Sequence, residues 1–394
     1  MIVSMERANG AIFAPPSKSA LHRRLILNAI AGCYAKPQSP CADVSATVRA
    51  LNAMKNGLPA DCGASGSTLR FLLPVSLLSA GGTFFGDSSL FQRPIAPLLD
   101  VLCAHGASVS VGKYTISVSG RLLPGDYALD GGISSQFFSG LLLTLPFLSG
   151  DSTLRWSSPL SSGGYVAMTE RMLKDHGVSV FRTETGYRIP GGQKPAALPL
   201  SVEGDWSCAA PMLILGAMLG SVTVKGLDAN SDQPDRTVLS VLRQCGAHVS
   251  VEGDAVTVSK GRLKSFKCNG DLSPDLVPAL AALGCACEGD AVLYRLGRLR
   301  YKESDRFTAI LSLLRSLGAD FDTERGDTIV IHGHGVLSGG TADVPSDHRM
   351  AMAAVLMSAV SAKPVHLSVP ACVEKSYPAF FTDFVSLGGR IDAI

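Results

Sequence analysis

The stretch LLDVLCAHGASVSV, residues 98–111, places apolar residues at helical spacing before a glycine and at alternating positions after it. The pattern returns in RMLKDHGVSVFR (171–182), VLRQCGAHVSV (241–251) and LLRSLGADFDT (313–323). A glycine directly after the last periodic residue is the usual C-terminal cap of a helix, and alternation predicts a strand. The four glycines are 71, 69 and 72 residues apart: Gly106, Gly177, Gly246 and Gly318. This spacing predicts a repeated helix–strand unit of about seventy residues.

A second segment recurs with the same period: a short polar cluster followed by an apolar helix. Four of these helices are predicted to start 72, 68 and 72 residues apart, at Ser135, Ser207, Asp275 and Asp347. Two earlier segments, PPSKSALHRRLILNAIA (15–31) and GASGSTLRFLLPVSLL (63–78), have the same character. Stretches such as SVTVKGL (221–227) and DTIVIHG (327–333) read as strands between the units. The sequence therefore predicts six similar β/α units.

The length of the chain indicates how many domains these units form. A chain of 394 residues exceeds one ordinary hydrophobic core, so two domains are expected. A single β/α unit cannot bury its own apolar face, and the units must pack against one another. We therefore expect three units in each domain.

Composition excludes several classes of protein. The net charge of +2, without a Lys/Arg-rich run, argues against a nucleic-acid partner. No signal peptide is recognised at the N-terminus, and the apolar runs are too short to span a membrane. The ten cysteines show no spacing typical of a metal site and read as buried residues of a reducing compartment. We expect a cytoplasmic protein that binds no metal.

Polar and cationic residues gather where the repeated helices begin. The first N–H groups of a helix are unpaired and lie at its positive pole, which favours anions. Arginine and lysine at such sites suit phosphate or carboxylate ligands. The candidates in the first half of the chain are Lys18, Ser19, Arg23, Gly66, Arg70, Arg93, Ser134, Ser135 and Gln136, with Ser162 and Tyr165 placed in a loop.

The second half contributes the most highly charged segment, RLRYKESDR, residues 298–306. Asp275 is predicted at a helix N-terminus, where the helix dipole would keep its carboxylate ionised. The other candidates are Lys302, Glu303, Arg306, Asp347, His348, Arg349 and Lys375. Several cations with a few carboxylates suit a reaction between two small anionic molecules. A non-catalytic anion-binding module would need the cations but not the carboxylates. The motifs of P-loop kinases, serine hydrolases and dinucleotide enzymes do not occur.

With these motifs in place, the chain closely resembles the 5-enolpyruvylshikimate-3-phosphate (EPSP) synthase family, nearly from end to end. The resemblance rests on PPSKSALHRR, GASGSTLRF, QRPIAPLLD, ISSQF, SPD, KESDR, DHRMAMA and EKSYPAFF, in this order. It implies an α/β fold of two domains, an inside-out α/β barrel of six βαβαββ units around inward-facing helices. The implied domains are residues 17–203 and residues 1–16 with 204–394. The implied active site lies in the cleft between them, where the six helix N-termini would converge.

In this family the enolpyruvyl group of phosphoenolpyruvate is transferred to the 5-hydroxyl of shikimate 3-phosphate, without a cofactor. The resemblance implies a cytoplasmic monomer with these two small molecules as its only partners. Asp275 is implied as the base, and Glu303 or Lys18 as the proton donor, with the choice left open. The implied shikimate-3-phosphate ligands are Lys18, Ser19, Arg23, Ser134, Ser135, Gln136, Ser162, Asp275, Arg298 and Lys302. The implied phosphoenolpyruvate ligands are Lys18, Gly66, Arg93, Gln136, Arg306, Arg349 and Lys375.

Four positions depart from the family pattern, namely Ala64, Phe71, Ala167 and Arg298, and leave substrate affinity and sensitivity to the inhibitor glyphosate open. One alternative is the sister enzyme, UDP-N-acetylglucosamine enolpyruvyl transferase. That family carries a reactive cysteine before its RP motif, whereas this chain reads GDSSLFQRP there. The other alternative is a non-catalytic anion-binding relative.

Overall fold

The computed structural model describes residues 1–35, 41–324 and 326–392. The chain divides into two compact units, residues 18–202 (hereafter the N-terminal unit) and residues 1–17 with 203–394 (the C-terminal unit). Pro16 and Gly204, near which we placed the crossings between domains, form an isolated antiparallel bridge. Each unit has its own apolar core. The predicted α/β fold of two domains is confirmed.

The strands form four-stranded sheets with one recurring order. In β3-β4-β6-β5, the first two strands are parallel, β4 pairs antiparallel with β6, and β6 pairs antiparallel with the edge strand β5. A helix connects the parallel pair, because parallel neighbours need a crossover, and a second helix leads into the hairpin. The strands of the N-terminal unit are β3 (Ala60–Asp61), β4 (Gly81–Phe85), β5 (Ala107–Val111), β6 (Thr115–Gly120), β7 (Asp126–Leu129), β8 (Ser152–Trp156), β9 (Phe181–Thr183) and β10 (Gly186–Ile189).

The C-terminal unit repeats this order in three sheets, β2-β11-β13-β12, β14-β15-β17-β16 and β18-β19-β1-β20. Its strands are β1 (Ile2–Ser4), β2 (Asn9–Phe13), β11 (Ser221–Lys225), β12 (His248–Glu252), β13 (Ala255–Ser259), β14 (Lys264–Asn269), β15 (Glu288–Tyr294), β16 (Asp320–Glu324), β17 (Thr328–His334), β18 (Gly340–Ala342), β19 (Val365–Leu367) and β20 (Arg390–Asp392).

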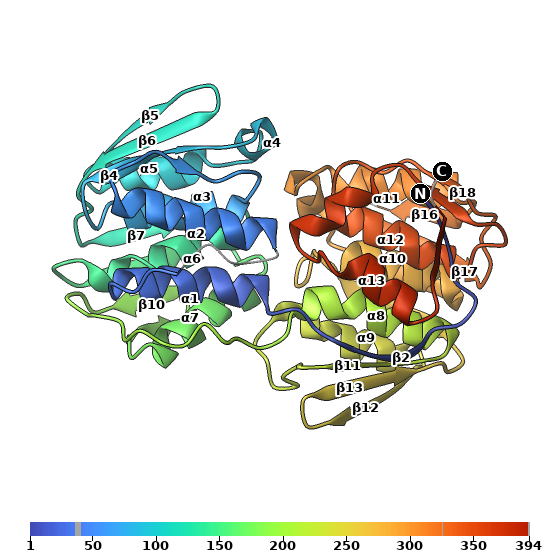
Figure 1. Cartoon of the computed structure of the whole chain (residues 1–394). Coiled ribbons are helices and arrows are strands. Elements are labelled where there is room, and N and C mark those ends of the chain that lie inside the picture. Colours follow the sequence, from blue (N-terminus) through green and yellow to red (C-terminus); the bar gives the residue numbers. More distant parts are fainter. Residues whose placement is uncertain (36–40, 325, 393–394) are drawn as a thin grey trace. The chain divides into compact units, whose positions relative to one another are not determined.

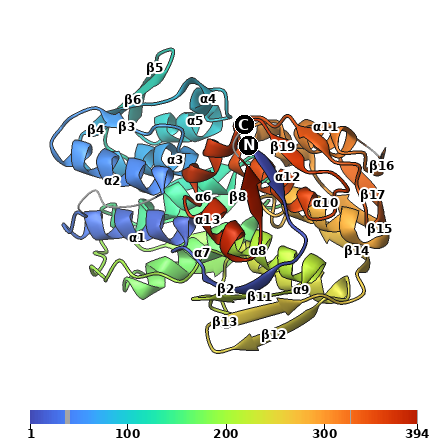
Figure 2. The same cartoon turned by 45° about the vertical axis from the view of Figure 1, so that its right-hand side comes forward.

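The N-terminal strands complete sheets at the other end of the chain. Strand β1 lies between β19 and β20 and pairs antiparallel with both, and β2 runs parallel to β11. The two ends of the chain are therefore neighbours in one sheet (Figure 2).

Six helices correspond to the predicted polar-start segments: α1 (Lys18–Ile30), α3 (Gly66–Ser76), α6 (Ser135–Leu142), α8 (Trp206–Leu219), α10 (Val277–Ala286) and α12 (His348–Ser358). In the C-terminal unit, α8, α10 and α12 pack against one another inside the sheets (Figure 1). Every residue of α12 is buried, and so is nearly every residue of α8 and α10. A helix that is buried on all sides belongs to a core, which is why these three segments are so apolar. In the C-terminal unit, the predicted inward-facing helices are confirmed.

The remaining helices are α2 (Ala42–Lys55), α4 (Ser88–Phe91), α5 (Ala96–Ala104), α7 (Gly163–Asp175), α9 (Val238–Gln244), α11 (Arg306–Ser316) and α13 (Phe380–Ser386). The four predicted cap glycines follow α5, α7, α9 and α11, each with a positive φ. Three further helices end in this way, α1 at Gly32 (φ 86°), α2 at Gly57 (φ 66°) and α13 at Gly388 (φ 113°). Gly388 lies 70 residues beyond Gly318, so the repeat period already pointed to it.

Among the described residues, five βαβαββ units have a complete sheet, whereas the sequence predicts six units. The helices α1 and α2 pack against each other and against α3, as the two helices of a sixth unit would. The segment 190–202, which closes the N-terminal unit, contains no strand. It includes Pro190, Pro195 and Pro199, and proline cannot donate to a sheet ladder.

Candidate functional site

Arg306 is the centre of a charged cluster in the C-terminal unit. It is the first residue of α11 and its side chain is 0% exposed. Its Nη1 donates to Oδ1 of Asp275 at 2.8 Å, and its Nη2 donates to Oε2 of Glu303 at 2.7 Å. One guanidinium therefore joins the turn before α10 to the segment before α11.

Asp347 accepts two hydrogen bonds from the guanidinium group of Arg306. It is the N-cap of α12, is fully buried, and accepts from Nε of Arg306 at 2.8 Å and from Nη2 at 3.2 Å. The hydroxyl of Ser304 (3.0 Å) and the backbone N–H of Arg349 (2.9 Å) also donate to it. A two-point contact between guanidinium and carboxylate fixes both groups, so Asp347 holds Arg306 in place.

Asp275 is the carboxylate that three cations face. Lys302 Nζ donates to its Oδ1 at 3.3 Å, and Arg349 Nη2 lies 4.0 Å from its Oδ2. Burial alone would raise the pKa of Asp275, but the charges of Lys302, Arg306 and Arg349 outweigh burial and hold the pKa well below its usual range. The side chain is still 25% exposed. The site therefore keeps an ionised carboxylate within reach of a ligand.

The neighbouring cations respond to the same environment. Burial lowers the pKa of Lys302, and Asp275 partly restores it. Burial opposes the charge of Arg349 as well, but nearby acidic groups, among them Asp275, raise its pKa above the ordinary value. Nη1 of Arg349 donates to the carbonyl of Ser207 at 2.7 Å, which ties the start of α12 to α8. The predicted residues Asp275, Lys302, Glu303, Arg306 and Arg349 are thus one cluster.

Two further predicted residues of the C-terminal unit lie in 3₁₀ turns. Arg298, in the 3₁₀ turn Gly297–Tyr301, pairs with Asp271 at 3.4 Å. Lys375 is half-buried at the end of a second 3₁₀ turn, Pro370–Lys375, which packs against α12.

In the N-terminal unit, Lys18 begins α1 and its Nζ bonds Oδ2 of Asp43 at 2.9 Å. Asp43 lies in the first turn of α2. Sequence reasoning missed Asp43 because it did not predict α2. The signals for this helix were a periodic apolar segment and the glycine that ends it, Gly57.

Arg23 is buried in a set of neutral acceptors one turn along α1. Its Nε donates to Thr169 Oγ1 at 2.7 Å, and Nη2 donates to Ser139 Oγ at 3.1 Å and to the carbonyl of Tyr165 at 2.8 Å. Nη1 donates to the carbonyl of Ser19, another predicted ligand, at 2.7 Å. Burial lowers the pKa of Arg23 to about 10, so the guanidinium stays charged at neutral pH. Its charge is fixed in position without a carboxylate in these contacts.

Gly66 begins α3 and lies against two guanidinium groups. A Cβ at this position would lie 2.6 Å from Nη1 of Arg93 and 2.7 Å from Nη1 of Arg70. Arg70 is itself held by the carbonyl of Pro94 at 2.8 Å. The absence of a side chain at Gly66 therefore lets both arginines approach the helix N-terminus.

The start of α6 supplies the predicted neutral groups. Ser134 is its N-cap and accepts from the backbone N–H of Gln136 at 3.3 Å, and Ser135 is buried. The Gln136 side chain donates to Ser67 Oγ at 3.0 Å. Gln136 is thus linked to the residue that follows Gly66.

Three sequence-based placements need correction. Tyr165 does not lie in a loop but in α7, and Ser162 is the N-cap of that helix, with φ 51°. The helix predicted at Ser207 begins at Trp206 because Asp205 caps it by accepting from Cys208 N. The helix predicted at Asp275 begins two residues later, at Val277, so Asp275 lies in the turn before it.

The departures from the family pattern are placed as follows. Phe71 is buried in α3, Ala167 lies in α7, Ala64 precedes the N-cap of α3, and Arg298 pairs with Asp271.

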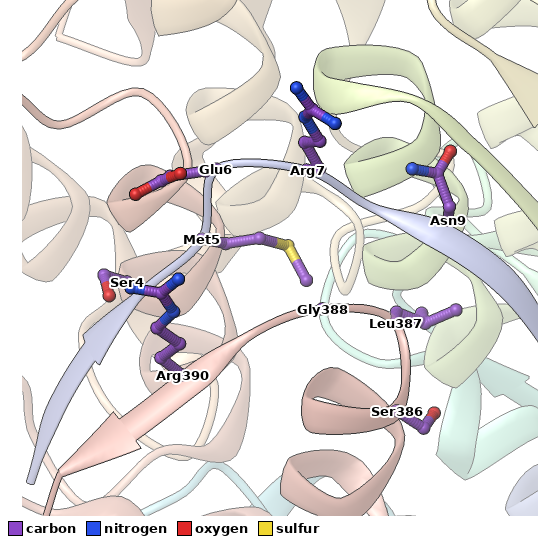
Figure 3. Close-up of a pocket in the computed structure, with 9 residues that line it drawn as sticks. All are labelled: Ser4, Met5, Glu6, Arg7, Asn9, Ser386, Leu387, Gly388 and Arg390. Atoms are coloured by element: carbon purple, nitrogen blue, oxygen red, sulfur yellow. The ribbon is translucent and has the colours of Figure 1, made fainter.

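A separate hollow of about 340 Å³ lies in the C-terminal unit beside the link between β1 and β2 (Figure 3). Arg7, Arg390 and Glu6 give its lining mixed charge, and no predicted substrate residue lines it. Within the described ranges, no cluster of His, Cys, Asp and Glu could hold a metal ion. No helix in those ranges is long and apolar enough to cross a bilayer.

Residues 41–384 match the sequence profile of the family described as EPSP synthase (3-phosphoshikimate 1-carboxyvinyltransferase). Among similar proteins, the 3-phosphoshikimate 1-carboxyvinyltransferase of Clostridium kluyveri is 35% identical over 99% of this chain and 97% of its own. That of Methanothrix thermoacetophila is 36% identical, with all of both chains covered.

Solved structures agree in fold. An EPSP synthase from Acinetobacter baumannii superposes with a TM-score of 0.80 at 24% identity, covering 100% of this chain and 99% of that one. The enolpyruvyl transferase NikO from Streptomyces tendae has a TM-score of 0.75 at 17% identity, covering 99% and 98%.

Proposed function

Because this chain belongs to the EPSP synthase family, we propose that it transfers the enolpyruvyl group of phosphoenolpyruvate to the 5-hydroxyl of shikimate 3-phosphate, releasing phosphate. Among the structural observations, the one that best supports this activity is the ionised Asp275 among Lys302, Arg306 and Arg349. It combines a base with the cations that two phosphorylated substrates require.

In the first step, the 5-hydroxyl oxygen attacks C2 of phosphoenolpyruvate while Asp275 takes the hydroxyl proton. A placed general base typically contributes about 10²–10⁴-fold. The methylene carbon gains a proton, from Glu303 or from Lys18, and a tetrahedral intermediate forms. Both donors are hydrogen-bonded, Glu303 to Arg306 at 2.7 Å and Lys18 to Asp43 at 2.9 Å.

In the second step, the intermediate loses phosphate, and the group that donated the methylene proton, Glu303 or Lys18, takes a methyl proton back, which restores the double bond in the product. The departing phosphate carries charge, and we assign its stabilisation to Arg93, Arg306, Arg349 and Lys375. An anion at Arg306 would compete with Asp275 and Glu303 for its N–H groups.

We assign shikimate 3-phosphate to ten residues: Lys18, Ser19, Arg23, Ser134, Ser135, Gln136, Ser162, Asp275, Arg298 and Lys302. Phosphoenolpyruvate is assigned to Lys18, Gly66, Arg93, Gln136, Arg306, Arg349 and Lys375. Each of the two sets includes residues of both units. The cytoplasmic location and the monomeric state stay predictions.

One assay tests the activity: release of phosphate from phosphoenolpyruvate, with shikimate 3-phosphate or UDP-N-acetylglucosamine as acceptor. We expect release with shikimate 3-phosphate alone. Release with UDP-N-acetylglucosamine alone would identify the sister activity, and release with neither would leave an anion-binding protein.

A further inference from the structure

A chain of buried hydrogen bonds joins α1, α2 and α3 beneath the residues assigned to phosphoenolpyruvate. Nδ1 of His22 lies 2.7 Å from Oγ1 of Thr47, and Thr47 Oγ1 lies 2.6 Å from Oγ1 of Thr68. Thr68 Oγ1 lies 2.7 Å from Oγ of Ser65. All four side chains are at most 1% exposed, so water cannot replace a missing partner.

One arrangement of donors satisfies every hydrogen bond of the network His22–Thr47–Thr68–Ser65. Burial lowers the pKa of His22 to about 3, with the nearby charges of Lys18 and Arg23 adding to the effect against Asp43, so the ring is neutral. A neutral ring carries one N–H, and its Nε2 has no hydrogen-bond partner. The network is satisfied when Nδ1–H of His22 donates to Thr47, Thr47 to Thr68, and Thr68 to Ser65. Nε2 then holds only a lone pair, which is less costly to bury alone than an N–H.

Both ends of this chain of hydrogen bonds, Ser65 and His22, lie close in the sequence to residues that we assign to phosphoenolpyruvate. Ser65 is the N-cap of α3 and directly precedes Gly66. His22 lies one turn after Lys18, and Thr47 lies one turn after Asp43, the partner of Lys18. Residues four apart share one face of a helix, so a shift at Thr47 would be transmitted to the Lys18–Asp43 pair. A shift of a few tenths of an ångström at Gly66 matters because Arg93 already lies against it.

We propose that Thr47 is a positioning residue that sets the place of Lys18 relative to Gly66 through the chain His22–Thr47–Thr68–Ser65. It thereby controls the affinity for phosphoenolpyruvate more strongly than that for shikimate 3-phosphate, because Gly66 and the adjacent Arg93 are assigned to phosphoenolpyruvate alone, whereas Lys18 is assigned to both. This inference rests on the proposed function. Thr47 bonds His22 and Thr68, and neither of these residues is assigned to a substrate.

The test is Thr47→Val, which keeps the shape of the side chain and removes both hydrogen bonds. We expect the KM for phosphoenolpyruvate to rise roughly tenfold, which corresponds to about 1.4 kcal/mol of binding free energy. The KM for shikimate 3-phosphate should stay within about twofold of the wild-type value. The factor by which kcat falls should be smaller than the factor by which the KM for phosphoenolpyruvate rises. Thr47→Ser, which restores a hydroxyl, should return the donor KM to within about threefold of wild type.

Thr144→Val is the matched control. Thr144 is buried in the same unit and donates to the carbonyl of Gly140 at 2.8 Å. Removing this hydrogen bond shows how the loss of any buried hydrogen bond in the N-terminal unit affects the two KM values. Both KM values should stay near wild type. An unchanged donor KM in Thr47→Val, an equal rise for both substrates, or failure of Thr47→Ser to recover would overturn the proposal. If Thr47→Val does not fold, Thr68→Val is measured against the same outcomes. A wild-type protein inactive with shikimate 3-phosphate would instead refute the proposed function itself.

Discussion

Among single residues, Asp275 combines the most unusual environment with the most direct proposed role. Its carboxylate shares Arg306 with Glu303, and Arg306 is anchored from the far side by the buried Asp347. The position of the base is thus set by groups that are themselves fixed. A substitution at Asp275 therefore changes charge at the site without removing the framework around it.

We expect Asp275→Asn to lower kcat at least about a hundredfold, within the usual range for loss of a general base. The amide keeps the size of the side chain, so the KM values should change little. Steady-state kinetics with both substrates checks this. Asp290→Asn, at an exposed carboxylate of the same unit that pairs with His332, is the control and should be nearly neutral. A turnover in Asp275→Asn near that of wild type would remove Asp275 from the role of base.

His22 predicts a pH dependence of stability. Its folded pKa is about 3 against an ordinary 6.5, so below pH 6.5 the unfolded chain takes up a proton that the folded chain does not. Its contribution is complete above pH 6.5 and is lost as the pH falls toward 3, at about 1.4 kcal/mol per unit. Between pH 7 and pH 5 we expect about 2 kcal/mol of lost stability from this group.

Urea unfolding of wild type and His22→Asn at pH 7 and pH 5 measures this contribution. The asparagine variant lacks the ionisation, so its stability should fall less over the same interval. Equal losses in the two proteins would show that His22 does not carry the effect.

At the level of helices and strands, the recurring signal is a glycine one residue beyond the helix cap. Seven helices of the described ranges end this way, and the three glycine ends that sequence reasoning missed, those of α1, α2 and α13, obey the same rule. The positive φ at these positions lets the chain reverse into a strand, and a side chain there is strained.

Gly177, with φ 77° and nothing within 4 Å of a built Cβ, isolates this backbone effect. Gly177→Ala should lower the free energy of unfolding by about 1 kcal/mol. Gly177→Asn should cost less, because asparagine tolerates the left-handed region. Chemical denaturation of both variants provides the comparison, and an alanine variant as stable as wild type would contradict the argument.

For the whole molecule, the main feature is that the C-terminal unit is built from both ends of the sequence. Strand β1 is an inner strand between β19 and β20, so that sheet cannot be complete without the first residues. The N-terminal unit, by contrast, is one continuous segment with its own core.

Deleting residues 1–5 should therefore loosen the C-terminal unit and leave the N-terminal unit intact. Limited proteolysis with mass spectrometry should show new cleavage near β19 and β20. The segment 18–202, expressed alone, is the control and should resist cleavage as it does in the full chain. If β20 is cleaved no faster after the deletion than in the full chain, β1 is not needed for the stability of this sheet.

The sequence was sufficient for most features that depend on local spacing. The apolar period, the glycines and the polar helix starts predicted the inner helices and four of the seven helix ends at a glycine, because these are set by neighbours a few residues apart. The motifs also pointed to Asp275, Lys302, Glu303, Arg306 and Arg349, which the fold brings into one cluster.

Contacts between distant segments required the folded chain. No local pattern links Lys18 to Asp43, Arg306 to the buried Asp347, or Thr47 to His22 and Thr68. The same holds for the low pKa of Asp275 and for the pairing of β1 with β20. Charge interactions and sheet ladders depend on distances across the core, and these distances exist only once the helices have packed.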